Sequence, residues 1–217
     1  MSRNITPPRA QETANAIGET ILRRTLRRHA AGVTIITVAG PAGFTATSFT
    51  SVSLEPPLVS FCVASAASVA GAVQRADRFA VHLLGPDDAE LADRFARSGV
   101  DRFAGTAGAY GPDGLPVLTA APAWLSARIV ARHRAGDHVL VVGAVDGGGV
   151  RREAPALLRH DGAYATAKRL PSSPSPSPSP SPSEEGPGTA ARAGRRGDDG
   201  SAPPVRSARP ARTGRRE

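Results

Sequence analysis

The chain has 217 residues, a formal net charge of +8 and one cysteine, Cys62. A single cysteine excludes an intrachain disulfide framework, and no apolar run approaches the roughly 18 residues of a membrane span. The first residues lack the apolar core of a secretory signal, so we expect a protein of a reducing compartment, the cytoplasm. The positive charge favours anionic partners such as nucleic acids, anionic membranes or phosphorylated cofactors.

Composition predicts three parts. Residues 1–18 are polar and contain Pro7-Pro8, which indicates a flexible arm, and residues 19–168 have the size of one ordinary domain. Residues 169–217 form a Ser-Pro and Arg-rich tail, which from Pro171 onward has ten of the 20 prolines and no Phe, Tyr, Trp, Ile or Leu. Such a segment buries too little apolar surface to offset its ordering entropy, so we expect the tail to be disordered.

Residue periodicity predicts a domain built mainly of strands with three helices. Helical spacing and helix-end signals predict the helices at 19–32, 68–77 and 86–99. Apolar or alternating runs predict six or seven strands, at 33–40, 44–49, 57–64, 78–85, 123–134, 137–146 and within 155–166. Short connections favour antiparallel pairing and a closed barrel, and the lack of regular strand–helix alternation argues against a parallel sheet.

Common catalytic motifs are absent from the sequence. It has no glycine-rich phosphate loop after a strand and no nucleophile elbow. Its five histidines lack the spacing of metal ligands, so we expect no metal site. The strongest remaining signal is the stretch from Gly43 to Leu58, in which six Ser and Thr hydroxyls fall within eleven residues.

Two interpretations of this hydroxyl-rich stretch are open from the residues alone. Short hydroxyls at a strand end suit a ligand with many acceptors, such as a phosphate or a flavin ring. Alternatively, the stretch is a solvated strand that turns at Glu55-Pro56-Pro57. His138 is equally open, because a histidine that follows a turn also fits a structural or solvated role.

The segment from Leu22 to Val73 resembles the opening half of the flavin reductase family, whose fold is the FMN-binding split barrel. The family's TANSFTSVSLDPPL compares with TATSFTSVSLEPPL at Thr45–Leu58. DRFAGT at 101–106, GDH at 136–138 and PALLRHDGAY at 155–164 resemble later blocks of the family. The resemblance implies a mainly β fold, a split β-barrel with Greek-key-like antiparallel strands.

The resemblance also implies an activity and a set of contacts. Members of the family are homodimers in which NADH or NADPH donates hydride to FMN or FAD, and many supply reduced flavin to a separate monooxygenase. Because the cofactor carries the reaction, no side chain is expected to act as a catalytic acid or base. The positions that match the family's nicotinamide contacts are His138 and, on the first helix, Arg24 or Arg28. Those that match the flavin contacts are Thr45, Ala46, Thr47, Ser48, Ser51, Val52, Cys62, Val63, Ser65, Ser68 and Phe103.

The chain departs from the family pattern at two places. Thr47 stands where Asn is common, which replaces an amide contact by a hydroxyl. The turn at 65–69 lacks the usual basic residue and has Val69 where Thr is usual, which weakens the expected phosphate site. Arg75 and Arg78 are close enough in sequence to be candidates for the missing charge.

Two other functions are compatible with parts of the sequence. A split barrel can bind flavin without reductase activity, or serve as an oxidase or a haem-linked protein. The basic tail suggests nucleic-acid binding, but it has no aromatic residue to stack on bases, so we do not expect a nucleic-acid partner.

Overall fold

The computed structural model describes residues 8–106 and 108–170, so the predicted tail lies almost entirely outside the described residues. Three α-helices lie in this part of the chain, α1 (Pro8–Leu26), α2 (Ala70–Arg75) and α3 (Ala89–Ala96), with 3-10 turns at Pro86–Asp88 and Pro112–Gly114. The strands are β1 (Ala31–Gly32), β2 (Thr34–Val38), β3 (Ala42–Ala46), β4 (Thr50–Leu54), β5 (Pro57–Ala64), β6 (Arg78–Leu83), β7 (Gly108–Tyr110), β8 (Pro116–Leu118), β9 (Ala123–Ala135), β10 (His138–Val150), β11 (Leu157–His160) and β12 (Ala163–Thr166).

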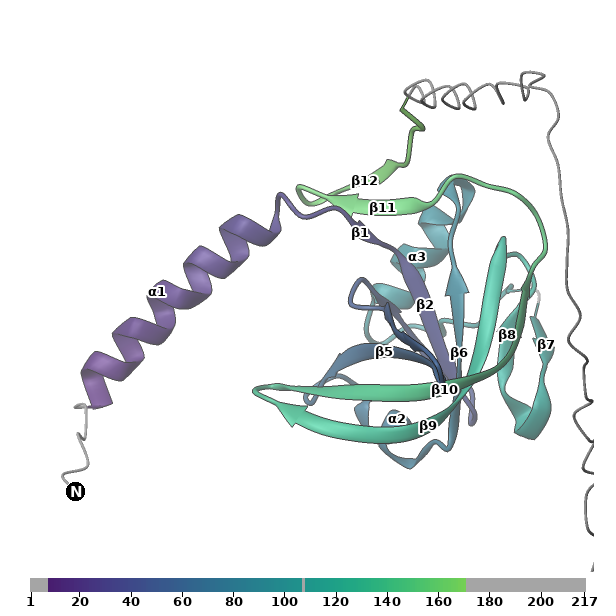
Figure 1. Ribbon diagram of the computed structural model, residues 1–217, viewed down its shortest axis with the longest axis horizontal. Helices are drawn as coiled ribbons and strands as arrows, with labels where there is room; N and C mark the ends of the chain where they lie inside the picture. The colour runs from purple at the N-terminus through teal and green to yellow at the C-terminus, as the bar shows by residue number, and fades with distance from the viewer. Residues whose placement is uncertain (1–7, 107, 171–217) are drawn as a thin grey trace, which may run out of the picture. The chain divides into compact units, whose positions relative to one another are not determined.

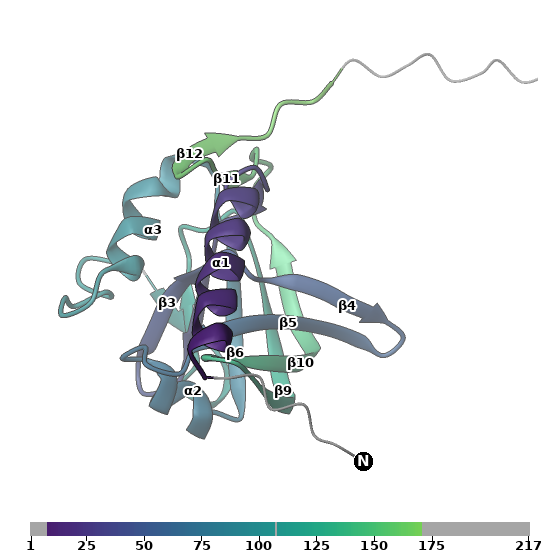
Figure 2. The same cartoon turned by 90° about the vertical axis from the view of Figure 1, so that its left-hand side faces the viewer.

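Seven of these strands form one antiparallel sheet in the order β3-β2-β6-β9-β10-β5-β4, with the edge strands β3 and β4 labelled in Figure 2 and the others in Figure 1. Strands β3 and β4 are consecutive in sequence, yet they are the two edges of the sheet. The three residues between them, 47–49, therefore cross from one edge to the other where the sheet curls round. This is the split of a split barrel, and it confirms the predicted fold class.

The β9–β10 hairpin is the longest feature of the sheet, with 13 residues in each strand. Gly136, at φ +62, supplies the left-handed conformation that its tight turn requires. Register shifts at Val142/Gly143 and at Val145/Gly147 bend the pair and help the sheet to close. At the first shift a side chain on Gly143 has no room, because its Cβ would lie 2.6 Å from Cζ of Phe79.

The interior of the barrel is packed around aromatic rings. Phe61 and Phe79 are fully buried and meet edge to face, with ring centroids 4.9 Å apart. Phe44 lies against Phe61 at 5.9 Å, on the side of β3. The sequence places these rings on three different strands, so their contact holds the curled sheet together.

A second apolar cluster lies on the other face of β2. All five residues of β2 are buried, and its alternate side chains enter two cores: Ile36 and Val38 the barrel interior, Ile35 the second cluster. The second cluster also contains Phe95, so it attaches α3 to the barrel. A strand buried on both faces explains why this run of sequence is continuously apolar or β-branched.

Helix α1 begins at Pro8, so the prediction of a flexible arm over residues 1–18 is wrong for residues 8–18. Proline is favoured in a first helical turn, where its missing N–H is not needed, and the residues after it include several good helix formers. The C-terminal end of α1 meets the turn between β11 and β12 (Figures 1 and 2), where Arg27 Nε donates to Asp161 Oδ1 at 2.9 Å. None of the helices described is long and apolar enough to cross a membrane.

The C-terminal segment of the domain, predicted as a short strand with a turn at Asp161-Gly162, forms a hairpin of β11 and β12 around that turn. Asp161 and Gly162 both have positive φ, 48 and 79, as a two-residue hairpin turn requires. Strand β11 pairs with β12 on one side and with β1 on the other, which makes a small second sheet.

Candidate active site

A cavity of about 390 Å³ lies where the β3–β4 connection, the end of β5 and helix α3 meet. Its volume is within the usual range of small-molecule sites. Eight of the residues predicted from the sequence line it together: Thr45, Ala46, Thr47, Ser48, Cys62, Val63, Ser68 and His138. The curling of the sheet brings these residues together from four separate parts of the chain.

The hydroxyls around this cavity have different partners. Thr45 Oγ1 donates to the carbonyl oxygen of Ala92 at 2.5 Å, so this hydroxyl attaches β3 to α3. Thr47 and Ser68 have no hydrogen-bond partner among the residues that the structure describes, and both are exposed. These two hydroxyls are therefore free to bind a ligand.

Ser48 joins the two sides of the split. Its hydroxyl accepts a hydrogen bond from the Cys62 N–H at 3.0 Å and lies 3.3 Å from the Cys62 carbonyl oxygen, to which it donates. Cys62 lies near the C-terminal end of strand β5, which pairs with the edge strand β4. Ser48 thus fixes the β3–β4 connection over the cavity by its contact with the backbone of β5.

Four of the predicted flavin-contact residues do not line this cavity. Ser51 and Val52 are exposed on β4, beyond the split. The Ser65 N–H donates to the Asp137 carbonyl oxygen at 2.8 Å, which attaches the end of β5 to the hairpin turn. Phe103 packs edge to face on Phe95 with centroids 5.0 Å apart, and it lines a smaller hollow next to the cavity.

Arg102 is the most important residue that the sequence reasoning missed. It is half-buried and lines both the cavity and the smaller hollow, as Ser68 also does. Its guanidinium donates to the carbonyl oxygens of Arg97 at 2.9 Å and Gly43 at 3.0 Å, which hold it in place. Arg102 belongs to the DRFAGT block, but the sequence does not show that this block folds back beside Ser68.

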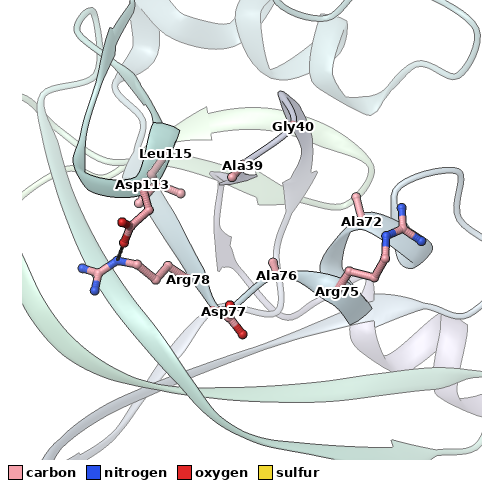
Figure 3. A pocket seen from close by; sticks show the side chains of 9 residues that line it. All are labelled: Ala39, Gly40, Ala72, Arg75, Ala76, Asp77, Arg78, Asp113 and Leu115. Atoms are coloured by element: carbon pink, nitrogen blue, oxygen red, sulfur yellow. Dashed lines mark ion pairs between the residues drawn. The ribbon is translucent and has the colours of Figure 1, made fainter.

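Arg75 and Arg78, the candidates for the missing charge, line a different hollow (Figure 3), so this expectation is wrong. Arg78 Nη2 lies 2.8 Å from Asp146 Oδ1, and its Nε lies 3.8 Å from Asp113 Oδ2. Arg75 is the last residue of α2 and Arg78 is the first of β6, and neither lines the spaces that Ser68 lines. The charge near Ser68 comes from Arg102 instead.

His138 begins strand β10 and lines the cavity from the hairpin side. Its Nδ1 lies 2.7 Å from Oδ1 of Asp137, an acceptor, so Nδ1 carries the proton and Nε2 is left for a ligand. The same hydrogen bond lowers the pKa of the exposed Asp137 carboxyl.

Arg24 and Arg28 do not line the cavity. Arg28 Nη1 lies 3.8 Å from Asp161 Oδ2 on the β11–β12 turn. Their sequence neighbours Arg23 and Arg27 line another hollow, which adjoins the cavity at Thr47 and Ser48. Arg23, on α1, and Arg27, in the turn after it, therefore line this neighbouring hollow, whereas Arg24 and Arg28 do not.

Residues 26–168 match the family described as Flavin reductase like domain, and the chain belongs to this family. It is 45% identical over 150 residues to the NADH:FMN oxidoreductase of Rhodococcus erythropolis, covering 65% of this chain and 78% of that protein. It is 35% identical over 154 residues to HsaB, the reductase subunit of a flavin-dependent monooxygenase of Rhodococcus jostii, covering 70% and 79%.

Solved structures agree with this assignment. A flavin reductase domain protein from Arthrobacter superposes with a TM-score of 0.68 at 40% identity, covering 71% of this chain and 98% of that one. An NADH:FAD oxidoreductase from Streptomyces globisporus, solved in complex with NAD and FAD fragments, gives a TM-score of 0.63 at 34% identity, covering 70% and 93%. The predicted fold and enzyme class are confirmed: the protein is an oxidoreductase that reduces flavin.

Proposed function

We propose that the cavity binds FMN or FAD and that NADH or NADPH donates hydride to the bound flavin. One observation carries the proposal: free hydroxyls, an arginine and a histidine from four parts of the chain surround one cavity of about 390 Å³. When both nucleotides are bound, the nicotinamide supplies the hydride and the flavin accepts it. The chain's own residues orient the two rings and exclude water.

The two ends of the cavity favour different parts of a flavin. Thr47 lies on the β3–β4 connection, where its free neutral hydroxyl suits the carbonyls and nitrogens of the ring. Ser68 and Arg102 lie together where the cavity opens into the smaller hollow, and a guanidinium beside a hydroxyl suits a phosphate. Arg102 thereby replaces the basic residue that the turn lacks.

His138 is placed to contact the nicotinamide. It lies on the rim formed by the hairpin turn, and the hydrogen bond to Asp137 fixes the ring with Nε2 available. An imidazole nitrogen suits the carboxamide of the nicotinamide, which both donates and accepts hydrogen bonds. In this arrangement His138 positions the donor and transfers no proton.

The exposed face of α1 supports a homodimer. Ile17, Ile21, Leu22 and Leu26 are each more than half exposed, although they share one side of a 19-residue helix. In proteins, most of the stability of a helix comes from tertiary packing of its apolar face. A second copy of the chain would cover this stripe, as expected of a dimer.

Two relatives are named as reductase subunits: HsaB, of a flavin-dependent monooxygenase, and Stc3, of stachydrine N-demethylase. This supports a role in supplying a partner monooxygenase.

Cys62 lines the cavity as a free thiol, which suits the reducing cytoplasm.

The test is a steady-state assay of the purified full chain that crosses FMN and FAD with NADH and NADPH. We expect nicotinamide oxidation only when flavin is added, and a change of flavin fluorescence on mixing with protein. The variant His138→Gln should raise KM for the nicotinamide and leave KM for flavin unchanged. The control His133→Gln removes an exposed histidine of β9 that does not line the cavity.

The outcomes separate the rival functions. Flavin binding without nicotinamide turnover would contradict the reductase and favour a non-reductase flavoprotein of the same fold. No change of flavin fluorescence, together with no turnover, would contradict the flavin site itself.

A further inference from the structure

The flavin cavity continues past Ser68 and Arg102 into the smaller hollow, which has a volume of about 230 Å³. Residues 41–43 at the β2–β3 turn and residues 100–103 after α3 line this hollow, together with Ser68 and Val69. It is smaller than the roughly 300 Å³ at which pockets for small molecules begin. A phosphate group is small enough for this space, whereas the adenylate that distinguishes FAD from FMN extends beyond it.

Arg102 has donors for one phosphate at this place. Its Nε donates to the Arg97 carbonyl oxygen at 2.9 Å and its Nη1 to the Gly43 carbonyl oxygen at 3.0 Å, which fixes the guanidinium. Nη2 donates to no residue in the part of the chain that the structure describes, so both of its N–H groups remain for a ligand. Charge-assisted bonds from a fixed guanidinium are a strong way to hold a phosphate.

The hollow has one further ionisable side chain, and it is acidic. Among the described residues that line it, Arg102 is the only cation and Asp101 the only anion. Asp101 Oδ1 accepts a hydrogen bond from the Phe103 N–H at 3.0 Å, and the carboxylate forms no ion pair within residues 8–106 and 108–170. Arg102 lines both spaces, whereas Asp101 lines only the hollow. A group that passes Arg102 into the hollow therefore meets an unpaired negative charge.

The two flavins distribute their phosphate charge differently. FMN ends in a phosphate monoester, which carries a charge of about −1.5 to −2 at pH 7. In FAD the same phosphate is esterified to a second one, so each phosphate carries a single charge. FMN thus places its negative charge beside Arg102, whereas FAD moves half of the charge away from Arg102 and towards Asp101.

We propose that the site selects FMN over FAD and that Asp101 is the residue that disfavours FAD. The inference rests on the proposed function and narrows it to one flavin. An unpaired charge placed against the wrong ligand is a general source of specificity. The adenine offers little in return, because the hollow is too small to enclose it.

The test measures kcat/KM of the full-length protein for FMN and for FAD at saturating NADH. We expect kcat/KM for FMN to exceed that for FAD by about tenfold in the wild type. Asp101→Asn removes the charge and keeps a side-chain oxygen that can accept from the Phe103 N–H. In this variant KM for FAD should fall about fivefold, the scale of one charge–charge interaction in a partly solvated site, while KM for FMN stays within about twofold.

Asp87→Asn is the matched control, because it makes the same chemical change and the same change of net charge. Asp87 is exposed in the 3-10 turn Pro86–Asp88 and lines neither the cavity nor the hollow. Both KM values should stay at their wild-type levels in the control. The melting temperatures of the two variants, measured alongside, show whether either change disturbs the fold.

A binding measurement makes the same comparison without turnover. FMN and FAD are titrated calorimetrically into the protein in the absence of nicotinamide. Kd for FAD should exceed Kd for FMN in the wild type, and the two values should approach each other in Asp101→Asn. Raised ionic strength should reduce the preference for FMN in the wild type more than in the variant, because salt screens the carboxylate.

Separate results would overturn separate parts of the inference. Equal Kd values of the wild type for FMN and FAD would contradict the selectivity, and a preference for FAD would show instead that the adenine finds a partner such as the Phe103 ring. A preference for FMN that is unchanged in Asp101→Asn would contradict the role of Asp101. A wild-type protein that binds neither flavin would contradict the proposed function, and the inference with it.

Discussion

The Ser48 hydroxyl lies between the N–H and the carbonyl of Cys62, 3.0 Å from the nitrogen and 3.3 Å from the oxygen. These hydrogen bonds attach the β3–β4 connection to β5, the strand next to the edge strand β4. The cavity lies at this crossing. The closure of the barrel and the shape of the site therefore depend on the same side chain.

Replacement of Ser48 by alanine should weaken the closure of the barrel and the binding of flavin at the site. The two backbone groups of Cys62 lose their partner, and each hydrogen bond contributes about 1 kcal/mol, so unfolding in urea should show a loss of about 1–2 kcal/mol. KM for flavin should rise as the β3–β4 connection loosens. Ser51→Ala, on the exposed β4, is the control and should change neither quantity. Equal stability of the two variants would contradict the role of Ser48.

Arg102→Gln should discriminate between flavins with and without a phosphate. We expect KM for FMN to rise about tenfold, which corresponds to about 1.4 kcal/mol, while KM for riboflavin changes little. Arg97→Gln removes a nearby exposed arginine that lines neither space and serves as the control. An equal loss with FMN and riboflavin would show that Arg102 acts only through its bonds to the backbone.

Gly143→Ala should destabilise the barrel. The added methyl group would lie 2.6 Å from Cζ of Phe79 and 3.0 Å from Cβ of Ala127, both inside the core. Overpacking of this kind typically costs 1–3 kcal/mol, so we expect a loss of about that size. Gly149→Ala on the same strand meets no atom within 4 Å and should be nearly neutral. Thermal unfolding of the two variants makes the comparison.

His82 should make stability depend on pH. Its Nδ1 donates to the Ile35 carbonyl oxygen at 3.0 Å and its Nε2 accepts from the Leu118 N–H at 3.0 Å, so both nitrogens are used by the neutral ring. Burial lowers the pKa of His82 from 6.5 to about 4. Between these values the unfolded chain binds a proton that the folded chain does not, so stability is complete above pH 6.5 and falls as the pH decreases towards 4.

The shift corresponds to about 3 kcal/mol between the two limits. Urea unfolding at several pH values between 4 and 7 measures it, and the slope should approach one proton taken up on unfolding. Asp137 and Asp161 also have lowered pKa values, from 3.8, so their contribution is lost only at lower pH. A stability that is constant between pH 6.5 and 4.5 would contradict the neutral, buried state of His82.

Local patterns predicted the elements whose signals are contained within a few residues. Strand β5 lies at Pro57–Ala64, as predicted, because a short, continuously apolar run after two prolines is typical of a buried strand. The hairpin turn at Gly136 was predicted because glycine adopts the positive φ that such a turn requires. The start of α1 was misplaced because its polar N-terminal half has no apolar periodicity, although its helix propensity is high.

The sequence by itself determined the family, the fold class and half of the residues that line the cavity, since those residues lie in contiguous motifs. Only the tertiary structure decided which hydroxyls are free and that Arg102, rather than Arg75 or Arg78, lies beside Ser68. It also decided that Arg23, rather than Arg24, lines the hollow that adjoins the cavity at Thr47 and Ser48. The physical reason is that the closure of the sheet and the phase of α1 set these contacts, and both depend on packing between segments distant in the chain.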